Sequence, residues 1–588
     1  MTLVFEKNSD TKKIFFLIFG IVFIVFLFTS DGHRYTMDED MGAQMALGMV
    51  TLEPHPDYVE GGTDRTSKVF FHMGDLHNPY NQGLNCTNGI TCYAASVFYS
   101  ATEVPFIALN HYFHIITSDT HVFTTDDFAD AHYVFWRNSE NPDFVFLELF
   151  YGPLFLALSA GIFFLICLEH KFTRQNSIIL SFLLAFSTII WAYSNTSLNV
   201  VPAAFFLLLG YLFYKKFCSL NQSKFLVLCS ASLAFTFLIR TDMILFIIPM
   251  WFFILVNILK RNSKIYTLLF YSVPLLFSYF VFRLVNPFSG TLRYIQPEDS
   301  TPAALGSEIG GFIFTSPISY ILTASYGMLF APGVGLFIFS PILLTVFFSF
   351  PDFFRKNKSE CILLLSFFVL SVVYHTNTHA WHGLVAWGSR YLVILIPFLL
   401  IPLGASLEQR NKKFMLLLIL SLGAIGVLFN LAYVLQDVHR FVWSTPGSDF
   451  GLYGLATPQF GHGFTLWLNP VVIWTFQFSQ LTQSLSLMFT SLQHDVYLLH
   501  AFGTSTSIAD ADRFKTANEA MSGIKDIKLR GSEKEFVNRF SLPAERLANY
   551  NAQKVLIASL PRYLLEVITF GGIVAIIISL IAINKGAK

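Results

Sequence analysis

Long apolar runs recur along the chain from near its first residue almost to its last. The first run, 14–29, contains no charged residue. Because a membrane-spanning helix needs about 20 mostly apolar residues, we predict twelve such helices and an all-α, polytopic membrane protein. The predicted spans are 14–29, 144–168, 177–193, 198–214, 224–239, 243–259, 265–285, 334–350, 360–376, 391–407, 413–435 and 564–583.

The distribution of lysine and arginine predicts the orientation of these helices. Cytoplasmic loops of membrane proteins are enriched in both residues, and here every second connection carries them. We therefore predict that both termini are cytoplasmic and that the long connections 30–143, 286–333, 377–390 and 436–563 face outward. The residues behind this prediction are Lys171, Arg174, Lys215, Lys216, Lys224, Lys260, Arg261, Lys264, Arg355, Lys356, Lys358, Arg410, Lys412, Lys413, Lys585 and Lys588.

Two apolar segments would break this alternation if they crossed the membrane. We expect 94–116, which contains Glu103 and Pro105, to form a helix at the outer interface. Segment 464–492 either lies outside or spans, and a span there would place 515–562 inside.

The spans and connections predict three parts of the chain. They are a membrane module (1–435) with a first outer loop (30–143), an outer-face soluble segment (436–563), and a last span with a cytoplasmic tail (564–588). We expect the first span to remain uncleaved, since no signal-peptidase-type site follows Phe28.

Composition narrows the class of protein. The 588 residues are 54% hydrophobic and 13% charged, whereas soluble domains carry about 25% charged residues. A soluble enzyme and a disordered chain are therefore excluded. The 38 basic and 38 acidic residues balance, so no nucleic-acid partner is expected. Cys86 and Cys92 lie in the first outer loop, where oxidation can occur, and we predict a disulfide between them; two free thiols are the alternative.

The first outer loop opens with three consecutive acids, Asp38, Glu39 and Asp40. Small and apolar residues follow at helical spacing, so the acids would form the first turn of an amphipathic helix resting on the membrane. A helix N-terminus stabilises carboxylates by roughly 0.3–1 kcal/mol. Such a carboxylate can accept a proton from a hydroxyl or hold a divalent cation. The alternative is an ordinary acidic helix start on a solvated loop.

Arginines at the outer ends of spans call for partners, because a charge at the membrane boundary is costly alone. Arg240 precedes Asp242 by two residues, so an ion pair would explain it. Arg390 opens a span without a nearby acid, and its guanidinium suits a phosphate at headgroup depth. An interfacial anchor between aromatic residues is the alternative. The arginines at outer ends are Arg34, Arg240, Arg283, Arg293 and Arg390.

Three histidines, His375, His379 and His382, fall in one outward connection. Their spacing would suit zinc on a helix, but Gly383 and Gly388 favour a loop. A polar lining for a sugar or phosphate, or ordinary interfacial residues, are the other interpretations.

Nucleotide-binding and metalloprotease motifs such as G-x-x-x-x-G-K-[ST], strand-linked G-x-G-x-x-G and H-E-x-x-H are absent from the sequence. The predicted cytoplasmic connections are also too short for a nucleotide-binding domain. A group-transfer reaction would therefore need a donor that is reachable from outside. A lipid-linked donor fits, because its phosphate would lie at the outer boundary beside an arginine.

Four stretches carry a resemblance to a known family. The chain resembles C-type integral-membrane glycosyltransferases that use polyprenyl-phosphate sugars, a superfamily (GT-C) that includes protein O-mannosyltransferases and aminoarabinose lipid A transferases. The stretch 381–392 is similar to the family pattern W-x-G-G-x-x-x-G-x-R-Y-L. Asn199, after the stretch 191–194, stands where this family would place an acidic residue. The stretches are MDED (37–40), WAYS (191–194), APGVGLFIFSP (331–341) and WHGLVAWGSRYL (381–392).

The resemblance implies a GT-C-like architecture and inverting sugar transfer at the outer face of the plasma membrane. The donor would be a polyprenyl-phosphate-linked sugar, the acceptor a lipid, glycan or protein, and membrane lipids would surround the chain. No cofactor is required, although a divalent metal could bind at Asp38 and Asp40. The implied site residues are Asp38 as general base with Glu39 beside it, Arg390, Arg240 and Arg34 for the donor phosphate, and His379, Trp381, His382 and Tyr391 for the sugar or acceptor.

Two other classes of function stay open from the sequence. A transporter of a lipid or small solute would be expected to show internal repeats and polar residues on broken midplane helices, whereas the ionisable residues here cluster toward one membrane face. A non-catalytic scaffold with the same fold, acting in cell-envelope assembly, would lack dependence on Asp38.

Overall fold

The structure is a computed structural model of the whole chain, divided into two compact units, Met1–Leu485 and Ser486–Lys588. It describes residues 9–30, 32, 37–52, 72–73, 84–86, 90–92, 97–117, 141–260, 265–285, 317–377, 381–383, 386–408, 413–435, 473–477, 479–494, 513, 515–522, 524–531, 533–541, 544 and 548.

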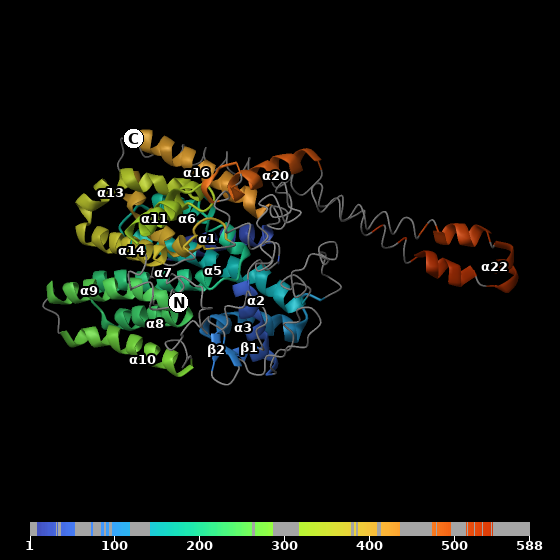
Figure 1. Cartoon of the computed structure of the whole chain (residues 1–588), viewed down its shortest axis with the longest axis horizontal. Coiled ribbons are helices and arrows are strands. Elements are labelled where there is room, and N and C mark those ends of the chain that lie inside the picture. The colour runs from blue at the N-terminus through green and yellow to red at the C-terminus, as the bar shows by residue number, and fades with distance from the viewer. Residues whose placement is uncertain are drawn as a thin grey trace. The chain divides into compact units, whose positions relative to one another are not determined.

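Helices make up nearly all of the described structure (Figure 1). They are α1 (Ser9–Phe28), α2 (Met37–Thr51), α3 (Val97–Phe113), α5 (Pro142–Glu169), α6 (Arg174–Phe186), α7 (Val200–Leu220), α8 (Ser223–Ile239), α9 (Ile244–Lys260), α10 (Leu269–Val285), α11 (Ile318–Phe330), α12 (Leu336–Phe339), α13 (Thr345–Lys356), α14 (Lys358–Thr376), α15 (Ile396–Leu407), α16 (Lys413–Val434), α20 (Gln480–His494) and α22 (Ile524–Arg530). Short 3-10 helices are η4 (Ala192–Asn195), η5 (Thr241–Met243), η6 (Ile265–Leu268), η9 (Pro341–Leu344) and η10 (Arg390–Leu395).

The helix lengths confirm a polytopic, all-α membrane protein. Among the described residues, 7 helices are long and apolar enough to cross a membrane. A helix overlaps each of the first eleven predicted spans, and the twelfth, 564–583, lies outside the described residues. The 7 candidates are Asp10–Phe28, Pro142–Glu169, Val200–Leu220, Thr241–Lys260, Lys358–Thr376, Arg390–Leu407 and Met415–Val434.

Two features differ from the sequence prediction. Span 334–350 is divided into α12, η9 and α13, because Pro341 cannot continue an α-helix through its missing N–H. Helix α11 lies in the connection 286–333, where we predicted no helix. Its 13 residues are fewer than a span requires, so the hydropathy criterion did not detect it.

Residues 37–51 and 97–113 form helices α2 and α3, as predicted, and the two helices pack on each other. Their position at the outer interface stays a prediction. Ala43, Ala46 and Leu47 of α2 are buried, and so is Glu103 of α3. A Cβ at Gly42 would lie 2.6 Å from the Tyr99 ring, so the two helices approach closely at this glycine. One face of helix α2 therefore belongs to the protein interior.

Three short strands also lie in this loop: β1 (His72–Met73), β2 (Leu84–Cys86) and β3 (Ile90–Cys92). They form an antiparallel sheet in the order β1-β3-β2, with Cys86 opposite Ile90 and Cys92 opposite Leu84. The side chains of the two cysteines lie outside the described residues, so their disulfide stays a prediction.

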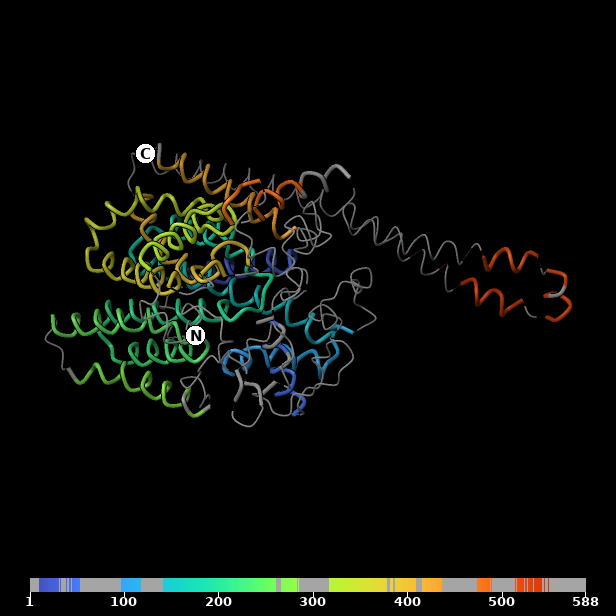
Figure 2. The backbone as a smooth tube through the Cα atoms, in the orientation of Figure 1, coloured from blue at the N-terminus to red at the C-terminus, as the bar shows by residue number. Residues whose placement is uncertain are grey.

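Helix α5 is the centre of the first unit, where it contacts α1, α3, α6, α7 and η4. Helices α7, α8 and α10 continue from it as a row of neighbours (Figure 2). Polar groups are paired inside this apolar packing, as burial requires. Ser197 donates to the Glu148 carboxylate over 2.7 Å, and Tyr99 donates to the Ser197 carbonyl over 2.8 Å. These bonds connect α3 and α5 to the segment that follows η4.

Gly152 permits the close contact between α5 and η4, because a Cβ there would lie 2.2 Å from the Ser194 carbonyl oxygen. We expect Gly152→Ala to lower stability by about 1–3 kcal/mol, measured as the thermal unfolding midpoint in detergent. Gly20→Ala in α1, where a Cβ meets nothing within 4 Å, is the matched control and should not destabilise the protein. Equal midpoints for the two variants would contradict this account of the packing.

Candidate functional site

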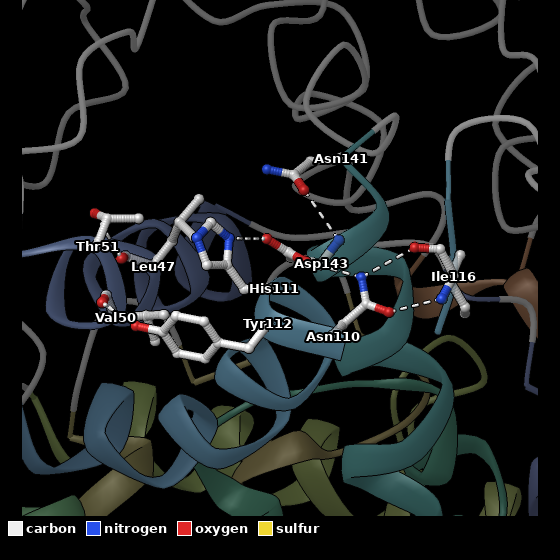
Figure 3. A network of polar contacts seen from close by, with 9 residues as sticks. All are labelled: Leu47, Val50, Thr51, Asn110, His111, Tyr112, Ile116, Asn141 and Asp143. Carbon is white, nitrogen blue, oxygen red and sulfur yellow. Dashed lines mark hydrogen bonds and ion pairs between the residues drawn. The ribbon is translucent and has the colours of Figure 1, made fainter. Parts of the chain in front are cut away.

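Polar contacts hold the acid-bearing helix α2 against α3, and α3 against α5 (Figure 3). The His111 Nδ1 lies 2.9 Å from the Asp143 carboxylate, and Asn110 donates to the same carboxylate over 2.8 Å. Asn141 caps α5 by accepting from the Asp143 backbone N–H. Tyr112 donates to the Val50 carbonyl near the end of α2 over 3.3 Å. The position of α2 is thereby fixed at its C-terminal end.

A buried ion pair lies between α8 and α9. Arg240 Nε and Nη2 donate to the two Asp242 carboxylate oxygens over 3.0 and 2.7 Å, and Nη1 donates to Asn199 at the start of α7 over 3.0 Å. Burial opposes the charge, but the Asp242 carboxylate raises the pKa of Arg240 above its ordinary value, so the guanidinium stays charged. The ion pair that we weighed for Arg240 is therefore present. A guanidinium has more N–H donors than these contacts use, so Arg240 can still contribute to a phosphate site.

His375 extends this pair toward Arg390. Its Nε2 lies 3.5 Å from the second oxygen of Asp242, and its ring stacks on Tyr391 at a centroid distance of 4.7 Å. The Arg390 guanidinium lies 5.3 Å from the centroid of the same tyrosine. The two arginines thus belong to one connected group of side chains from α7, α8, η5, α14 and η10.

Tyr193 in η4 is a buried residue within electrostatic range of acidic and basic side chains from several elements. It is 2% exposed, and its hydroxyl has no hydrogen-bond partner among the residues that the structure describes. Coulombic interactions link it to Arg390, Tyr391, Glu39 and Arg240. Glu39 in α2 is fully buried. We call Glu39, Tyr193, Arg240, Arg390 and Tyr391 the arginine site.

The loop before η10 presents Arg390. Gly383 and Gly388 have φ values of +77° and +67°, which favour glycine, and a Cβ at Gly383 would lie 3.2 Å from the Arg390 Cγ. The Ser389 hydroxyl donates to the Val334 carbonyl over 2.9 Å. Trp387 donates to Asn430 in α16 over 3.1 Å. Arg390 is partly exposed, unlike the loop residues that support it.

The other predicted pocket residues form an aromatic group beside this loop. Trp381 and His382 are each 8% exposed, with ring centroids 5.6 Å apart. Trp381 also meets Trp474 at 6.1 Å, and a Cβ at Gly327 in α11 would lie 2.3 Å from the Trp381 ring. Trp381 and His382 are thus packed into the protein, and Tyr391 lies in the arginine site.

Several predicted residues have no described side chain. These are Asp38 and Asp40, whose helical backbone is described, and Arg34, His379, Arg283 and Arg293. Among the described side chains, no group of three or more His, Cys, Asp or Glu could hold a metal ion. His375 contacts Asp242 and Tyr391. These contacts, rather than a zinc ion, explain where the histidine side chain lies.

Sequence reasoning identified Asp242 as a partner of Arg240 but missed the contacts of Tyr193 and His375 with the rest of the site. Tyr193 does belong to the WAYS stretch that resembles the family. A tyrosine in an apolar run is a weak signal, however, because such residues are commonly core residues.

No protein-family model matches the sequence, and no curated protein matches it. Two similar solved structures are both of ArnT from Cupriavidus metallidurans. The apo-state structure shares 10% sequence identity at a TM-score of 0.40, and the match covers 86% of this chain and 81% of that chain. The structure bound to undecaprenyl phosphate shares 13% identity at a TM-score of 0.39, with the same coverage.

We expect Asp242→Asn to destabilise the protein by about 3 kcal/mol, because it leaves the buried Arg240 charge uncompensated. Thermal and denaturant unfolding in detergent would measure the loss. The double variant Arg240→Met with Asp242→Leu removes both charges and should recover most of the stability. Equal stability of the Asp242→Asn variant and the wild type would contradict the conclusion that the ion pair stabilises the folded protein.

Proposed function

We propose that the chain is a membrane glycosyltransferase that transfers a sugar from a polyprenyl-phosphate-linked donor to a hydroxyl of a lipid, glycan or protein. The observation that carries this proposal is the arginine site. It holds two arginines from distant parts of the sequence and the buried Glu39 of α2, all within electrostatic range of the buried Tyr193.

The arginine site suits the phosphate of a lipid-linked donor. Arg390 is partly exposed and opens a candidate membrane span, so it can meet a phosphate whose lipid tail lies in the bilayer. Negative charge grows on that phosphate as the sugar leaves, and cations already held in place stabilise it without reorganising. Arg240 adds a second, fixed positive charge. We propose Arg34, which lies three residues before the first residue of α2 in sequence, as a third contact.

We propose Asp38 as the general base. Asp38 would accept the proton of the acceptor hydroxyl while the acceptor oxygen bonds to the anomeric carbon of the sugar. The bond from that carbon to the phosphate oxygen breaks in the same step, which releases polyprenyl phosphate and inverts the anomeric configuration. We propose that Glu39, which is buried in the same helical turn, assists Asp38.

The remaining predicted residues are proposed to line the sugar or acceptor pocket. His379, Trp381, His382 and Tyr391 lie on or beside the loop that presents Arg390, and aromatic faces with polar edges suit a sugar ring. We propose no required cofactor, with a divalent cation at Asp38 and Asp40 as an alternative. The distribution of basic residues supports cytoplasmic termini and a site at the outer face of the plasma membrane.

Binding of undecaprenyl phosphate to the purified protein in nanodiscs tests the donor site. We expect saturable binding by the wild type and at least tenfold weaker binding by Arg390→Ala, since hydrogen bonds to charged groups contribute about 1.5–3 kcal/mol each. Arg355→Ala, which removes an arginine from the last turn of α13, is the matched control and should bind as wild type. A folded wild type that does not bind would refute the donor assignment.

Loss of sugar transfer in Asp38→Asn tests the general base. We expect transfer from radiolabelled undecaprenyl-phosphate-linked hexoses, in membranes that contain the cell's own acceptors, to fall by about 10²–10⁴-fold. Undecaprenyl phosphate binding should change little. Asp10→Asn, an exposed carboxylate in α1, is the control. If Asp38→Asn keeps full biological function, the scaffold interpretation replaces the enzyme.

A further inference from the structure

Residues 473–485 belong to the region that matches no family motif, yet they pack against both stretches that flank Arg390. The Ile473 carbonyl accepts a hydrogen bond from the Gly333 N–H over 2.9 Å. Ile473 and Leu481 are 5% and 3% exposed and join the core of the first unit. This segment is therefore built into the membrane module rather than laid over it.

Gln480 makes the closest connection. Its side chain is almost fully buried, and its Nε2 donates to the Gly333 carbonyl over 2.7 Å and to the Ala386 carbonyl over 2.9 Å. Both partners are acceptors, so only the amide nitrogen can satisfy them. One side-chain group thus bridges the turn at 331–335 to the loop that contains Arg390.

The loop needs such a bridge. Gly383 and Gly388 give its backbone more freedom than other residues would. Ser389 already bonds the loop to Val334, and Gln480 adds a second attachment to the same turn, four residues before Arg390. Two attachments to one turn restrict where η10 begins and therefore where its first side chain lies.

We propose that Gln480 is a positioning residue that holds Arg390 where it meets the phosphate of the lipid-linked donor. This inference rests on the proposed function for the identity of the ligand. The restraint that Gln480 places on the loop does not depend on the proposed function. Among the described residues the Gln480 Oε1 has no hydrogen-bond partner. Burying an unsatisfied acceptor is unfavourable, so an apolar residue would suit this position at least as well if packing were the sole requirement.

The test compares Gln480→Met with Gln483→Met, using undecaprenyl phosphate as the ligand. Gln483 lies in the same helix, is partly exposed and donates to the Gln477 carbonyl, so it controls for the same change of side chain. We expect Gln480→Met to weaken binding about tenfold, the loss of two neutral hydrogen bonds, and Gln483→Met to leave it within about twofold. If Gln480→Met does not fold, Gln480→Asn, which keeps the amide on a shorter stem, replaces it.

The double variant with Arg390→Ala separates positioning from general weakening. If Gln480 acts through Arg390, adding Gln480→Met to Arg390→Ala should change the affinity by less than about twofold, because coupled residues are not additive. A further tenfold loss in the double variant would overturn the proposal.

Hydrogen exchange of the ligand-free protein tests the role of Gln480 separately from the proposed function. Backbone amides of 386–392 should exchange faster in Gln480→Met than in wild type or Gln483→Met. If the wild type binds no undecaprenyl phosphate, the donor assignment fails, and faster exchange in Gln480→Met still supports the restraint on the loop. Unchanged exchange there would overturn the role of Gln480 whatever the ligand.

Discussion

An arginine inside an apolar helical protein requires a compensating carboxylate, and the Arg240–Asp242 pair meets this requirement. The pair also does more than neutralise a charge, because its remaining contacts reach Asn199 in one direction and His375 in the other. Stacking of His375 on Tyr391 then brings the start of η10 against the same group. One buried ion pair thus connects side chains of α7, α8, α14 and η10.

Hydropathy was sufficient to predict the membrane helices because the bilayer imposes a minimum apolar length on every span. The same rule explains both errors: α11 is too short to meet it, and Pro341 divides a run that does. The convergence of Glu39, Arg240 and Arg390 was not predictable from periodicity, since it depends on contacts between segments far apart in sequence. The family resemblance indicated these residues singly, and only the packing shows that Tyr193 joins them.

Arg240 and Arg390 carry the same charge in different settings. Arg240 is buried and its direction is set by Asp242 and Asn199, whereas Arg390 is partly exposed and lies beside the face of Tyr391. A fixed charge suits long-range stabilisation of an anion, and a more accessible charge suits direct contact. The chain thus offers an anionic ligand two arginines with different freedom to move.

The contact of Gly333 with Ile473 and Gln480 has a consequence for the biosynthesis of the protein. Ribosomes deliver the chain from its N-terminus, so the first eleven predicted spans enter the membrane before residues 473–485 emerge. During that interval the loop before η10 lacks one of its two attachments to the 331–335 turn. The surroundings of Arg390 are therefore completed late in synthesis, and a nascent chain that stops after α16 would carry the arginines of the site without its finished geometry.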